Sequence, residues 1–385
     1  MSPIPPGATI GFLGGGQLGR MAGIAARELG YRVRVLDPDP HCAAGPVADA
    51  QHIAGFDDVN AARALARSSA VVSYEIEGVS AAVLQAVGAE AALRPGAHVL
   101  SIVQDREIQK RWLGERGFPI GPWAVASDAA ALAEVASTIG APVRLKAARD
   151  GYDGRSQAKC SAGEDLTALW HAMGQKRCVV ERELDLAAEC SVLVARRPLG
   201  VQVVVHPVAR NWHLESILDI SLFPSGLPSS VERKAEEIAR SLADELNVEG
   251  LLVVEFFVTR DGSVLVNELA PRPHNSFHHA EAACGVGQFE QYIRAICDLP
   301  LAEVSLTRSA ALANLLGDLW QDGRPPAFER ALAVPGIQLH LYGKTHRPGR
   351  KLGHLVSHGA TSAEALERLN AARDALAQRS TQAAR

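Results

Sequence analysis

The first hundred residues alternate short apolar runs with longer mixed stretches, which predicts strands separated by helices. Residues 8–13 read as a buried strand that ends at three glycines, and residues 17–29 read as a helix closed by a glycine. Apolar runs at residues 32–36 and 70–74 predict two further strands. Because strands that alternate with helices indicate a parallel sheet, we expect a Rossmann-like α/β domain over residues 1–100.

The next two hundred residues mix helical and strand patterns without that regular alternation. Residues 229–246 predict a long helix, because no glycine or proline interrupts them. Apolar runs at residues 251–259 and 263–268 flank an Asp-Gly pair, which is typical of a hairpin turn. We therefore expect an α+β region over residues 101–300.

The last part of the chain, residues 301–385, is shorter and more mixed. The pattern predicts a helix near residues 310–316, a strand at residues 337–341 and a final helix that begins at Ser362. The polar residues from 378 onward are expected to fray. These elements predict a third, smaller domain.

Composition narrows the class of protein. Among 385 residues, 47% are hydrophobic and 21% are charged, a balance typical of globular proteins with two or three domains. The net charge of −4 comes without a basic block, which argues against non-specific binding of nucleic acid. No apolar run approaches the roughly 18 residues of a membrane span, and residues 1–9 lack the pattern of a signal peptide. We expect a cytoplasmic protein.

Glycines near the N-terminus form a loop between the first predicted strand and helix. Gly14, Gly16 and Gly19 satisfy G-x-G-x-x-G, and the free N–H groups of a helix N-terminus attract anions. With Asp37 available for a ribose, this pattern fits a dinucleotide-dependent oxidoreductase. It also fits the phosphate of a nucleotide monophosphate, or a tight turn without a ligand. The motif alone leaves these three interpretations open.

Two acidic residues stand inside the apolar strands of the predicted hairpin. Glu255 lies in LLVVEFFV and Glu268 in SVLVNEL, so the tight turn sets them side by side. An acid in an apolar strand is costly to bury unless it is paired or coordinates a metal. Magnesium prefers oxygen ligands, and Asn267 supplies another oxygen. The pair therefore favours a magnesium site over structural salt bridges.

A cationic grip on phosphates is expected upstream of this hairpin. Arg106 lies in QDREIQK, and Lys146 ends the strand VRLK, where an ammonium group should point at an anion. A loop with two glycines follows, and its cation and hydroxyl groups suit a lid over ATP phosphates better than a plain surface turn. Its residues are Gly151, Tyr152, Asp153, Gly154, Arg155, Ser156 and Gln157.

The next strand offers a place for an adenine base. Residues 179–184 read as a strand that runs into a connector, which presents backbone groups to a base edge. Glu189 is available for the ribose hydroxyls. The residues expected around the base are Glu181, Arg182, Glu183 and Leu184.

These motifs, in this order, resemble the ATP-grasp superfamily and, within it, the family of N5-carboxyaminoimidazole ribonucleotide synthases. The resemblance covers nearly the whole chain and rests on GGGQLGRM, SYEIEGV, QDREIQKRWL, GYDGRSQ, VNELAPRPHNS, GQFEQYIRAI and LYGKTHRPGRKLGH. It implies a Rossmann-like domain, a two-lobed ATP-grasp domain and a small, mainly β C-terminal domain. The implied reaction joins bicarbonate to aminoimidazole ribonucleotide through carboxyphosphate, with ATP converted to ADP and phosphate, in purine biosynthesis.

The resemblance also implies roles for single residues. It implies that ATP contacts Arg106, Lys146, residues 151–157, residues 181–184 and Glu189, and also His213, Asn267 and Glu268. It further implies that Glu255 and Glu268 bind Mg²⁺. Bicarbonate and the reacting amine are matched by Asp153, Arg155, Arg272 and His274. The ribonucleotide is matched by Gln17, Leu18, Glu75, Asn275, Ser276, Lys344, Arg350 and Lys351. A homodimer, and a separate mutase that takes the product, are implied as well.

The chain departs from the family pattern at a few positions. Asp150 precedes the predicted lid and Ser156 interrupts it, which places an extra acid near the ATP phosphates. Phe277 stands where the family has glycine, and phenylalanine does not adopt positive φ as cheaply, so the backbone or substrate fit is expected to differ there. His278 and His279 follow, but no further ligand spacing supports a metal site.

Three other functions stay open. A sister ATP-grasp ligase would use formate or another acid in place of bicarbonate. A nicotinamide oxidoreductase would rest on the glycine motif, but it leaves the acidic hairpin and the basic cluster near Lys344 unexplained. A non-catalytic nucleotide-binding relative would fit the departures, although the residues that a ligase needs are all present in the sequence.

Overall fold

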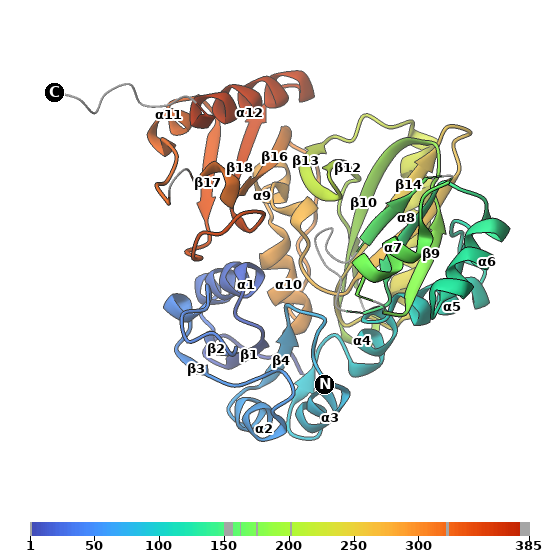
Figure 1. Ribbon diagram of the computed structural model, residues 1–385. Coiled ribbons are helices and arrows are strands. Elements are labelled where there is room, and N and C mark those ends of the chain that lie inside the picture. Colours follow the sequence, from blue (N-terminus) through green and yellow to red (C-terminus); the bar gives the residue numbers. More distant parts are fainter. Residues whose placement is uncertain are drawn as a thin grey trace.

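The described part of the chain folds into β-sheets with helices around them (Figure 1). The computed structural model describes residues 2–149, 157–161, 163–174, 176–200, 202–320 and 323–377. Among these residues, a five-stranded parallel sheet occupies the N-terminal part, and a four-stranded and a nine-stranded antiparallel sheet occupy the rest. The predicted combination of α/β and α+β parts is therefore confirmed.

The N-terminal sheet has the strand order β3-β2-β1-β4-β5, and all its pairs are parallel. Ile10 and Phe12 of β1 are completely buried, because helices cover both faces of such a sheet. The predicted Rossmann-like strands and first helix are confirmed. The elements are β1 (Thr9–Leu13), α1 (Gln17–Glu28), β2 (Arg32–Leu36), β3 (Ala50–His52), α2 (Val59–Arg67), β4 (Val71–Tyr74), α3 (Ala81–Gly88) and β5 (Ala92–Leu93).

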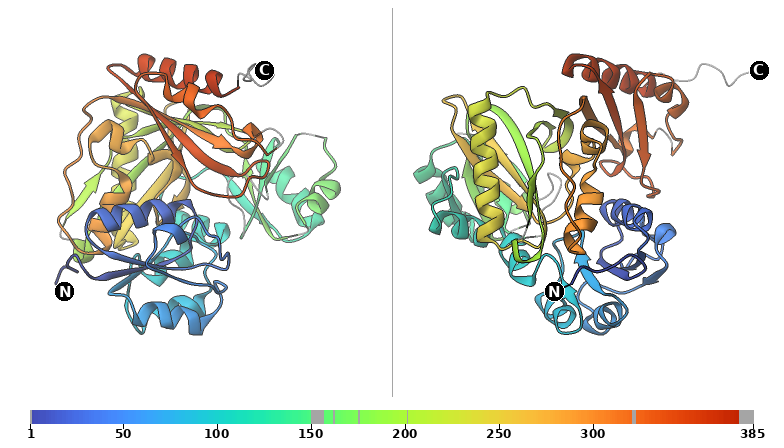
Figure 2. Two further views of the ribbon diagram at one scale, coloured as in Figure 1. Left: turned by 90° about the vertical axis from the view of Figure 1, so that its left-hand side faces the viewer. Right: turned by 180° about the vertical axis from the view of Figure 1, so that it is seen from behind.

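A four-stranded sheet of order β6-β9-β7-β8 forms a small lobe that stands out from the rest of the molecule (Figure 2, left). Leu132 and Trp170, from two helices, fill its core together with Val180. Two helices lead into the lobe. The elements are α4 (Ala97–Val103), α5 (Arg106–Glu115), β6 (Trp123–Ala126), α6 (Ala129–Ile139), β7 (Val143–Ala147), β8 (Gln157–Cys160), α7 (Leu166–Ala172) and β9 (Cys178–Arg182).

The nine-stranded sheet joins the predicted metal hairpin to the C-terminal strands. Its order is β15-β14-β10-β12-β13-β16-β18-β17, with β11 paired to β10. Ile220 pairs with Ala313, so the third part of the chain continues the sheet of the second. The elements are β10 (Leu186–Arg196), β11 (Val203–Val205), β12 (Ala209–Leu214), β13 (Ile217–Phe223), α8 (Ser229–Glu245), β14 (Gly250–Thr259), β15 (Val264–Ala270), β16 (Ser309–Leu316), α11 (Phe328–Leu332), β17 (Ile337–Leu341) and β18 (Lys351–Gly359).

One sequence prediction is wrong, because residues 310–316 are not helical. They belong to β16, which lies between β13 and β18 and is buried along almost its whole length. A short, continuous apolar run fits a strand covered on both faces as well as a helix, and strand pairing decides between them. The predicted strand at residues 337–341 and the final helix are confirmed as β17 and α12 (Ser362–Ala377).

Helices α9 (Ala280–Cys284) and α10 (Gln288–Ile296) lie between the first sheet and the large sheet (Figure 1). Tyr292 of α10 is fully buried, and its hydroxyl donates to the backbone oxygen of Tyr74 at 3.0 Å. Its ring lies 6.3 Å from that of Phe12, so one core joins both parts. Among the described residues, no helix is both long and apolar enough to cross a bilayer.

Candidate active site

The two acids of the predicted metal site lie on paired strands. Glu255 of β14 and Glu268 of β15 are register partners across the hairpin. Burial raises the pKa of Glu255, and the neighbouring carboxylate of Glu268 adds to that rise. Two carboxylates at facing positions repel each other unless a cation lies nearby, so this pair suits a hard, oxygen-binding ion such as Mg²⁺.

Asn267 connects these acids to Lys146, one of the two cations predicted to bind phosphate. Its Nδ2 donates to Glu255 Oε2 at 3.3 Å, and its Oδ1 accepts from Lys146 Nζ at 3.1 Å. Arg106 reaches the same hairpin, with Nη2 3.3 Å from Glu268 Oε1. The structure therefore brings both predicted phosphate-binding cations beside both predicted magnesium ligands, a combination suited to Mg-ATP.

A further carboxylate faces Lys146 from strand β9. Glu181 Oε2 lies 2.6 Å from Lys146 Nζ, and Glu181 Oε1 lies 2.8 Å from Lys110 Nζ. Burial alone would raise the pKa of Glu181, but the two ammonium groups outweigh it and lower that pKa to about 2. The sequence motifs did not single out Lys110. Its position four residues after Arg106 places both cations on one face of α5, and this spacing is the signal that was available.

The connector after β9 is held by contacts within the protein. Arg144 contacts Glu183 at 3.3 and 3.1 Å, and the amides of Arg182 and Glu183 donate to proline carbonyls. The side chain of Arg182 is exposed, whereas Leu184 is partly buried. The backbone amides and the Glu183 carboxylate of this connector are therefore already bonded within the protein.

Glu189 lies next to His213, and both were predicted to contact the nucleotide. Glu189 Oε2 is 3.0 Å from His213 Nδ1. Burial alone would lower the pKa of His213, but the carboxylates of Glu189 and Glu255 raise it overall. Because the charge of Glu255 acts on His213, this pair adjoins the hairpin predicted to bind the metal.

Arg272 and His274 are the two predicted catalytic residues that the structure describes. Arg272 Nη2 lies 2.9 Å from a carboxylate oxygen of Glu77. His274 Nε2 lies 3.4 Å from Glu255 Oε1, while its Nδ1 lies 2.9 Å from Ser276 Oγ. Burial lowers the pKa of His274, and the charge of Arg272 lowers it further. A neutral imidazole therefore stands beside the acidic hairpin.

Asn275 and Ser276, predicted to contact the ribonucleotide, differ in exposure. Ser276 is fully buried, with its Oγ 2.8 Å from Ser191 Oγ and its carbonyl accepting from Ser221. The amide nitrogen of Asn275 has no hydrogen-bond partner among the described residues. A buried donor without a protein partner is suited to a ligand, so Asn275 has the better placed side chain of the two.

Acids of the protein itself occupy the glycine-rich loop. Glu75 Oε1 accepts from the amide of Gly16 at 2.7 Å, and its Oε2 accepts from the amide of Gly19 at 3.3 Å. Asp37 Oδ2 accepts from the amide of Gly15 at 2.7 Å. A dinucleotide needs such amides for its pyrophosphate. Since carboxylates hold them, the oxidoreductase interpretation loses its basis.

Predicted ribonucleotide contacts come together where the first and third parts of the chain meet. Lys344, in the loop between β17 and β18, donates to Oε1 of Gln17 at the start of α1. Burial raises the pKa of Glu75, and the ammonium group of Lys344 acts against that rise, so these two residues are also neighbours. Leu18 is buried in the core of the first part, which leaves its backbone for a ligand.

Arg350 and Lys351 diverge at the start of β18. Arg350 Nη1 donates to the backbone oxygen of Thr345 at 2.9 Å. Lys351 is buried, and its charge is one of the influences, after burial and Arg272, that lower the pKa of His274. The charge of Lys351 therefore acts on His274, and Arg350 is bonded within the adjoining loop.

Phe277 follows Asn275 and Ser276, and its side chain is part of the core. It is fully buried in a 3₁₀ turn (Asn275–Phe277), and it is not among the described residues with positive φ. Its ring lies 5.7 Å from that of Phe223, onto which His279 stacks at 4.2 Å. The turn thus places no φ penalty on phenylalanine, and the side chain adds to the core.

Most of the predicted lid lies outside the described residues. Gln157 is described, and it begins β8 as the register partner of Lys146. Gln157, the last residue of the predicted lid, is therefore held beside Lys146 by strand pairing. The predicted residues outside the description are Gly151, Tyr152, Asp153, Gly154, Arg155 and Ser156, together with Asp150.

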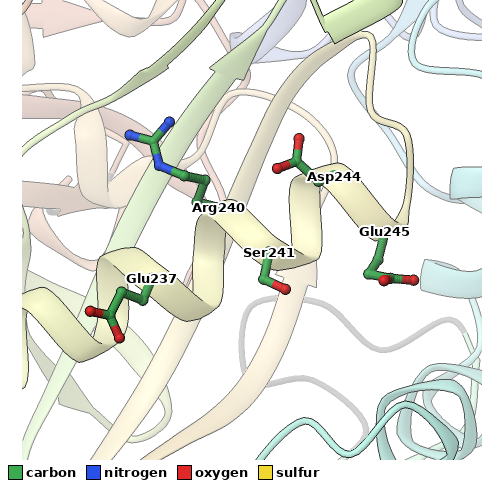
Figure 3. Close-up of a pocket in the computed structure, with 5 residues that line it drawn as sticks. All are labelled: Glu237, Arg240, Ser241, Asp244 and Glu245. Carbon is green, nitrogen blue, oxygen red and sulfur yellow. The ribbon is translucent and has the colours of Figure 1, made fainter.

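A surface pocket lies along helix α8 (Figure 3). Its lining consists of three acids, one arginine and one serine, all on this helix, and none of them is a predicted site residue. Such a set is typical of a solvated helix face. The lining residues are Glu237, Arg240, Ser241, Asp244 and Glu245.

Three stretches of the chain match known domain families. Residues 7–104 match the ribonucleotide synthetase preATP-grasp domain, and residues 111–289 match the ATP-grasp domain. Residues 310–368 match the phosphoribosylaminoimidazole carboxylase C-terminal domain. The three predicted domain types are therefore confirmed in their predicted order.

Similar proteins cover almost the whole chain. The N5-carboxyaminoimidazole ribonucleotide synthases of Bacillus subtilis and Brucella melitensis are each 37% identical over 356 residues. These matches span 92% of this chain, and 92% and 97% of the two relatives. The match is therefore not confined to the ATP-binding part.

Solved structures agree with these matches. A crystal structure of an N5-carboxyaminoimidazole ribonucleotide synthetase with ADP superimposes with a TM-score of 0.92 at 37% identity, and covers 98% of this chain and 100% of its own. The Aspergillus clavatus synthase in complex with ADP and 5-aminoimidazole ribonucleotide gives a TM-score of 0.88 at 29% identity, with coverage of 96% and 98%. From its predicted motifs, its fold and these relatives, the chain belongs to the N5-carboxyaminoimidazole ribonucleotide synthase family of ATP-grasp ligases.

Proposed function

We propose that this chain joins 5-aminoimidazole ribonucleotide and bicarbonate to form N5-carboxyaminoimidazole ribonucleotide, with conversion of ATP to ADP and phosphate, in purine biosynthesis. The observation that carries the proposal is the meeting of Glu255 and Glu268 with the cations Arg106 and Lys146. Two acids and two cations at one hairpin suit the metal and phosphates of Mg-ATP. Relatives named for this activity support it over 92% of the chain.

Glu255 and Glu268 would hold the magnesium ion. Their carboxylate oxygens fit a hard cation, and the raised pKa of Glu255 reflects burial and repulsion that such a cation relieves. When bound, the metal neutralises phosphate charge. Arg106 and Lys146 would bind the phosphates, and Leu184 and Glu189 would bind the base and the ribose.

The chemistry requires positioning more than covalent participation by the protein. Bicarbonate is a poor electrophile, and transfer of the γ-phosphoryl group to it supplies a leaving group. The carboxyphosphate, or CO₂ released from it, is then captured by the amine of the ribonucleotide. Arg272, held by Glu77, would orient the anion, and the neutral imidazole of His274 would keep Glu255 in place.

The ribonucleotide would lie between the N-terminal part and the C-terminal strands. Lys344 is the cation best placed for its phosphate, because it already meets Gln17 and Glu75 at this junction. Glu75, braced by the glycine loop, would face the substrate, and Asn275 would supply a free amide donor. Lys351 would contribute charge from the side of His274.

The proposal also includes the oligomeric state, the location, the fate of the product and the acid that is phosphorylated. The protein would act as a homodimer in the cytoplasm. Its product is a carbamate, which a separate mutase would convert. Bicarbonate is the acid that the ligase would phosphorylate.

The decisive experiment measures phosphate release from Mg-ATP, with the ribonucleotide and bicarbonate added separately and together. The proposal expects rapid release, with formation of the carboxylated product, only when both are present. Formate replaces bicarbonate in a parallel reaction, and faster turnover with formate would assign a sister ligase. ATP binding without phosphate release under any of these conditions would assign a non-catalytic relative.

A further inference from the structure

Lys110 is a buried cation that the proposed chemistry does not yet use. It lies on α5 and shares Glu181 with Lys146, one ammonium group on each carboxylate oxygen, at 2.8 and 2.6 Å. The three side chains are only 5 to 10% exposed. Two buried cations share one buried carboxylate, and each needs a nearby anion to stay charged.

The two lysines face different surroundings. Lys146 also donates to Asn267, which bonds to Glu255, and its Nζ lies 5.9 Å from the ring of Phe257. It is therefore directed toward the hairpin that would hold the metal. For Lys110, Glu181 is the acid within salt-bridge distance among the described residues.

Glu181 itself is held in place by the sheet. It lies on β9, between β6 and β7, where its backbone pairs with Trp123 on one side and Arg144 on the other. The sheet therefore fixes its backbone, and its carboxylate lies between the two lysines. When Lys146 turns to a phosphate, Glu181 needs another cation, because a buried carboxylate without a partner is strongly unfavourable.

We propose that Lys110 is a positioning residue that keeps Glu181 paired while Lys146 exchanges this carboxylate for the phosphates of the nucleotide. The inference rests on the proposed function, since it takes Lys146 as a phosphate ligand. Burial lowers the pKa of Lys110, and the charge of Glu181, with a smaller contribution from Glu268, works against this lowering. Without Lys110, Lys146 would have to remain paired with Glu181. It could then not bind the phosphates, and the affinity for ATP would fall.

The test compares binding of ATP and adenosine by calorimetry in the full-length protein. Lys110→Met should weaken the binding of ATP by about tenfold or more. The affinity for adenosine, which has no phosphate, should stay the same. Lys110→Arg restores the charge and should recover most of the affinity for ATP. The control Arg111→Met removes a cation from an exposed position of the same helix and should change neither affinity.

A second-site variant separates indirect from direct action. Lys110→Met combined with Glu181→Gln removes the acid that needs a partner, so Lys146 is released and ATP affinity should return toward that of Glu181→Gln alone. If Lys110 touched phosphate directly, the double variant would stay weaker than Glu181→Gln. That result would overturn the inference. Because this comparison uses no variant with an unpaired Glu181, it holds even if Lys110→Met alone does not fold.

Two outcomes distinguish this inference from the proposed function. If the unaltered protein does not bind ATP, the proposed function fails, and the role of Lys110 fails with it. If the unaltered protein binds ATP and turns over, but Lys110→Met binds ATP equally well, only the role of Lys110 is overturned. A lower melting temperature with unchanged ATP affinity has the same meaning, since it describes a purely structural lysine.

Discussion

Two histidines of one short segment illustrate two different regions of the molecule. His274 has the carboxylate of Glu255 3.4 Å away and belongs to the candidate active site. His278 comes four residues later, and its ring stacks at 5.4 Å on Phe289 and at 4.7 Å on His354. The two residues are of the same type and lie only four positions apart in the sequence. What differs is the set of partners: a carboxylate for His274, and two aromatic rings with the amide of Gln288 for His278.

This difference separates function from stability. Side chains of the site have charged or ligand-binding partners, so changes there should affect turnover more than folding. Side chains of the layer behind it, formed by Phe277, His278, His279 and His206, are buried among aromatic rings, and His278 also has the side-chain amide of Gln288 2.8 Å from its Nδ1. Changes there should affect folding more than turnover. Four variants test this division.

Glu268→Gln tests the site side of the division, with the largest expected effect. Loss of a magnesium ligand should slow phosphate release by about a thousandfold, which corresponds to about 4 kcal/mol in activation free energy. The melting temperature should change little, because Glu268 is partly exposed. Turnover near that of the unaltered protein, with the same magnesium requirement, would remove Glu268 from the metal site.

Phe277→Ala tests the layer behind the site. Its ring is completely buried against Phe223 and His206, so the cavity should cost about 3 to 5 kcal/mol of unfolding free energy. Denaturant unfolding measures this loss, and calorimetry should find ATP affinity unchanged below the unfolding transition. A large loss of ATP affinity in the folded variant would show that the two regions are not separate.

His206 makes the stability of this layer depend on pH. Burial lowers its pKa to about 4, and neither ring nitrogen has a hydrogen-bond partner among the described residues. The unfolded chain, with an ordinary pKa near 6.5, therefore takes up the proton first. Stability is fully present above pH 6.5 and falls as the pH drops toward 4.

Between pH 7 and pH 5, His206 should account for about 2 kcal/mol of the lost unfolding free energy. His206→Leu should show a smaller loss over this range by about that amount, as measured by denaturant unfolding at both pH values. An identical loss in the variant would mean that other groups cause the acid sensitivity. His279, with a pKa lowered to about 3 by burial, is the next residue to examine.

Lys344→Ala tests the site at its junction with the N-terminal part, with the smallest expected effect. The KM for the ribonucleotide should rise by about tenfold, equal to about 1.4 kcal/mol. The KM for ATP should stay the same, because Lys344 lies by Gln17 and not at the hairpin. Equal increases for both substrates would contradict a role in binding the substrate phosphate.

Much of the fold could be predicted from local pattern. The strands and helix around the glycine loop and the Asp-Gly hairpin have strong local signals, and the structure contains them. β16 could not be identified in this way. Its apolar run fits a helix as well as a strand, and only its pairing with β13 and β18 decides.

The candidate site shows a similar limit. An acid in an apolar strand and a lysine at a strand end are unusual enough by themselves, so Glu255 and Lys146 could be predicted as candidate site residues from the sequence. The occupation of the glycine loop by Glu75 was not, because these residues are 59 and 56 positions apart and only the fold brings them together. Lys110 was missed for the same reason, since its partner Glu181 lies on another element.

The pairing of β13 with β16 has a mechanical consequence. It makes the hairpin of Glu255 and Glu268 and the strand of Lys351 parts of a single hydrogen-bonded plate. Lys146 stands on the separate four-stranded lobe. Any hinge motion between the two would change the distance from Lys146 to the acids and leave the distance from the acids to Lys351 constant. In the proposed function, this plate would keep the spacing between the metal site and the ribonucleotide site constant, and a movement of the lobe would change the position of Lys146 relative to both.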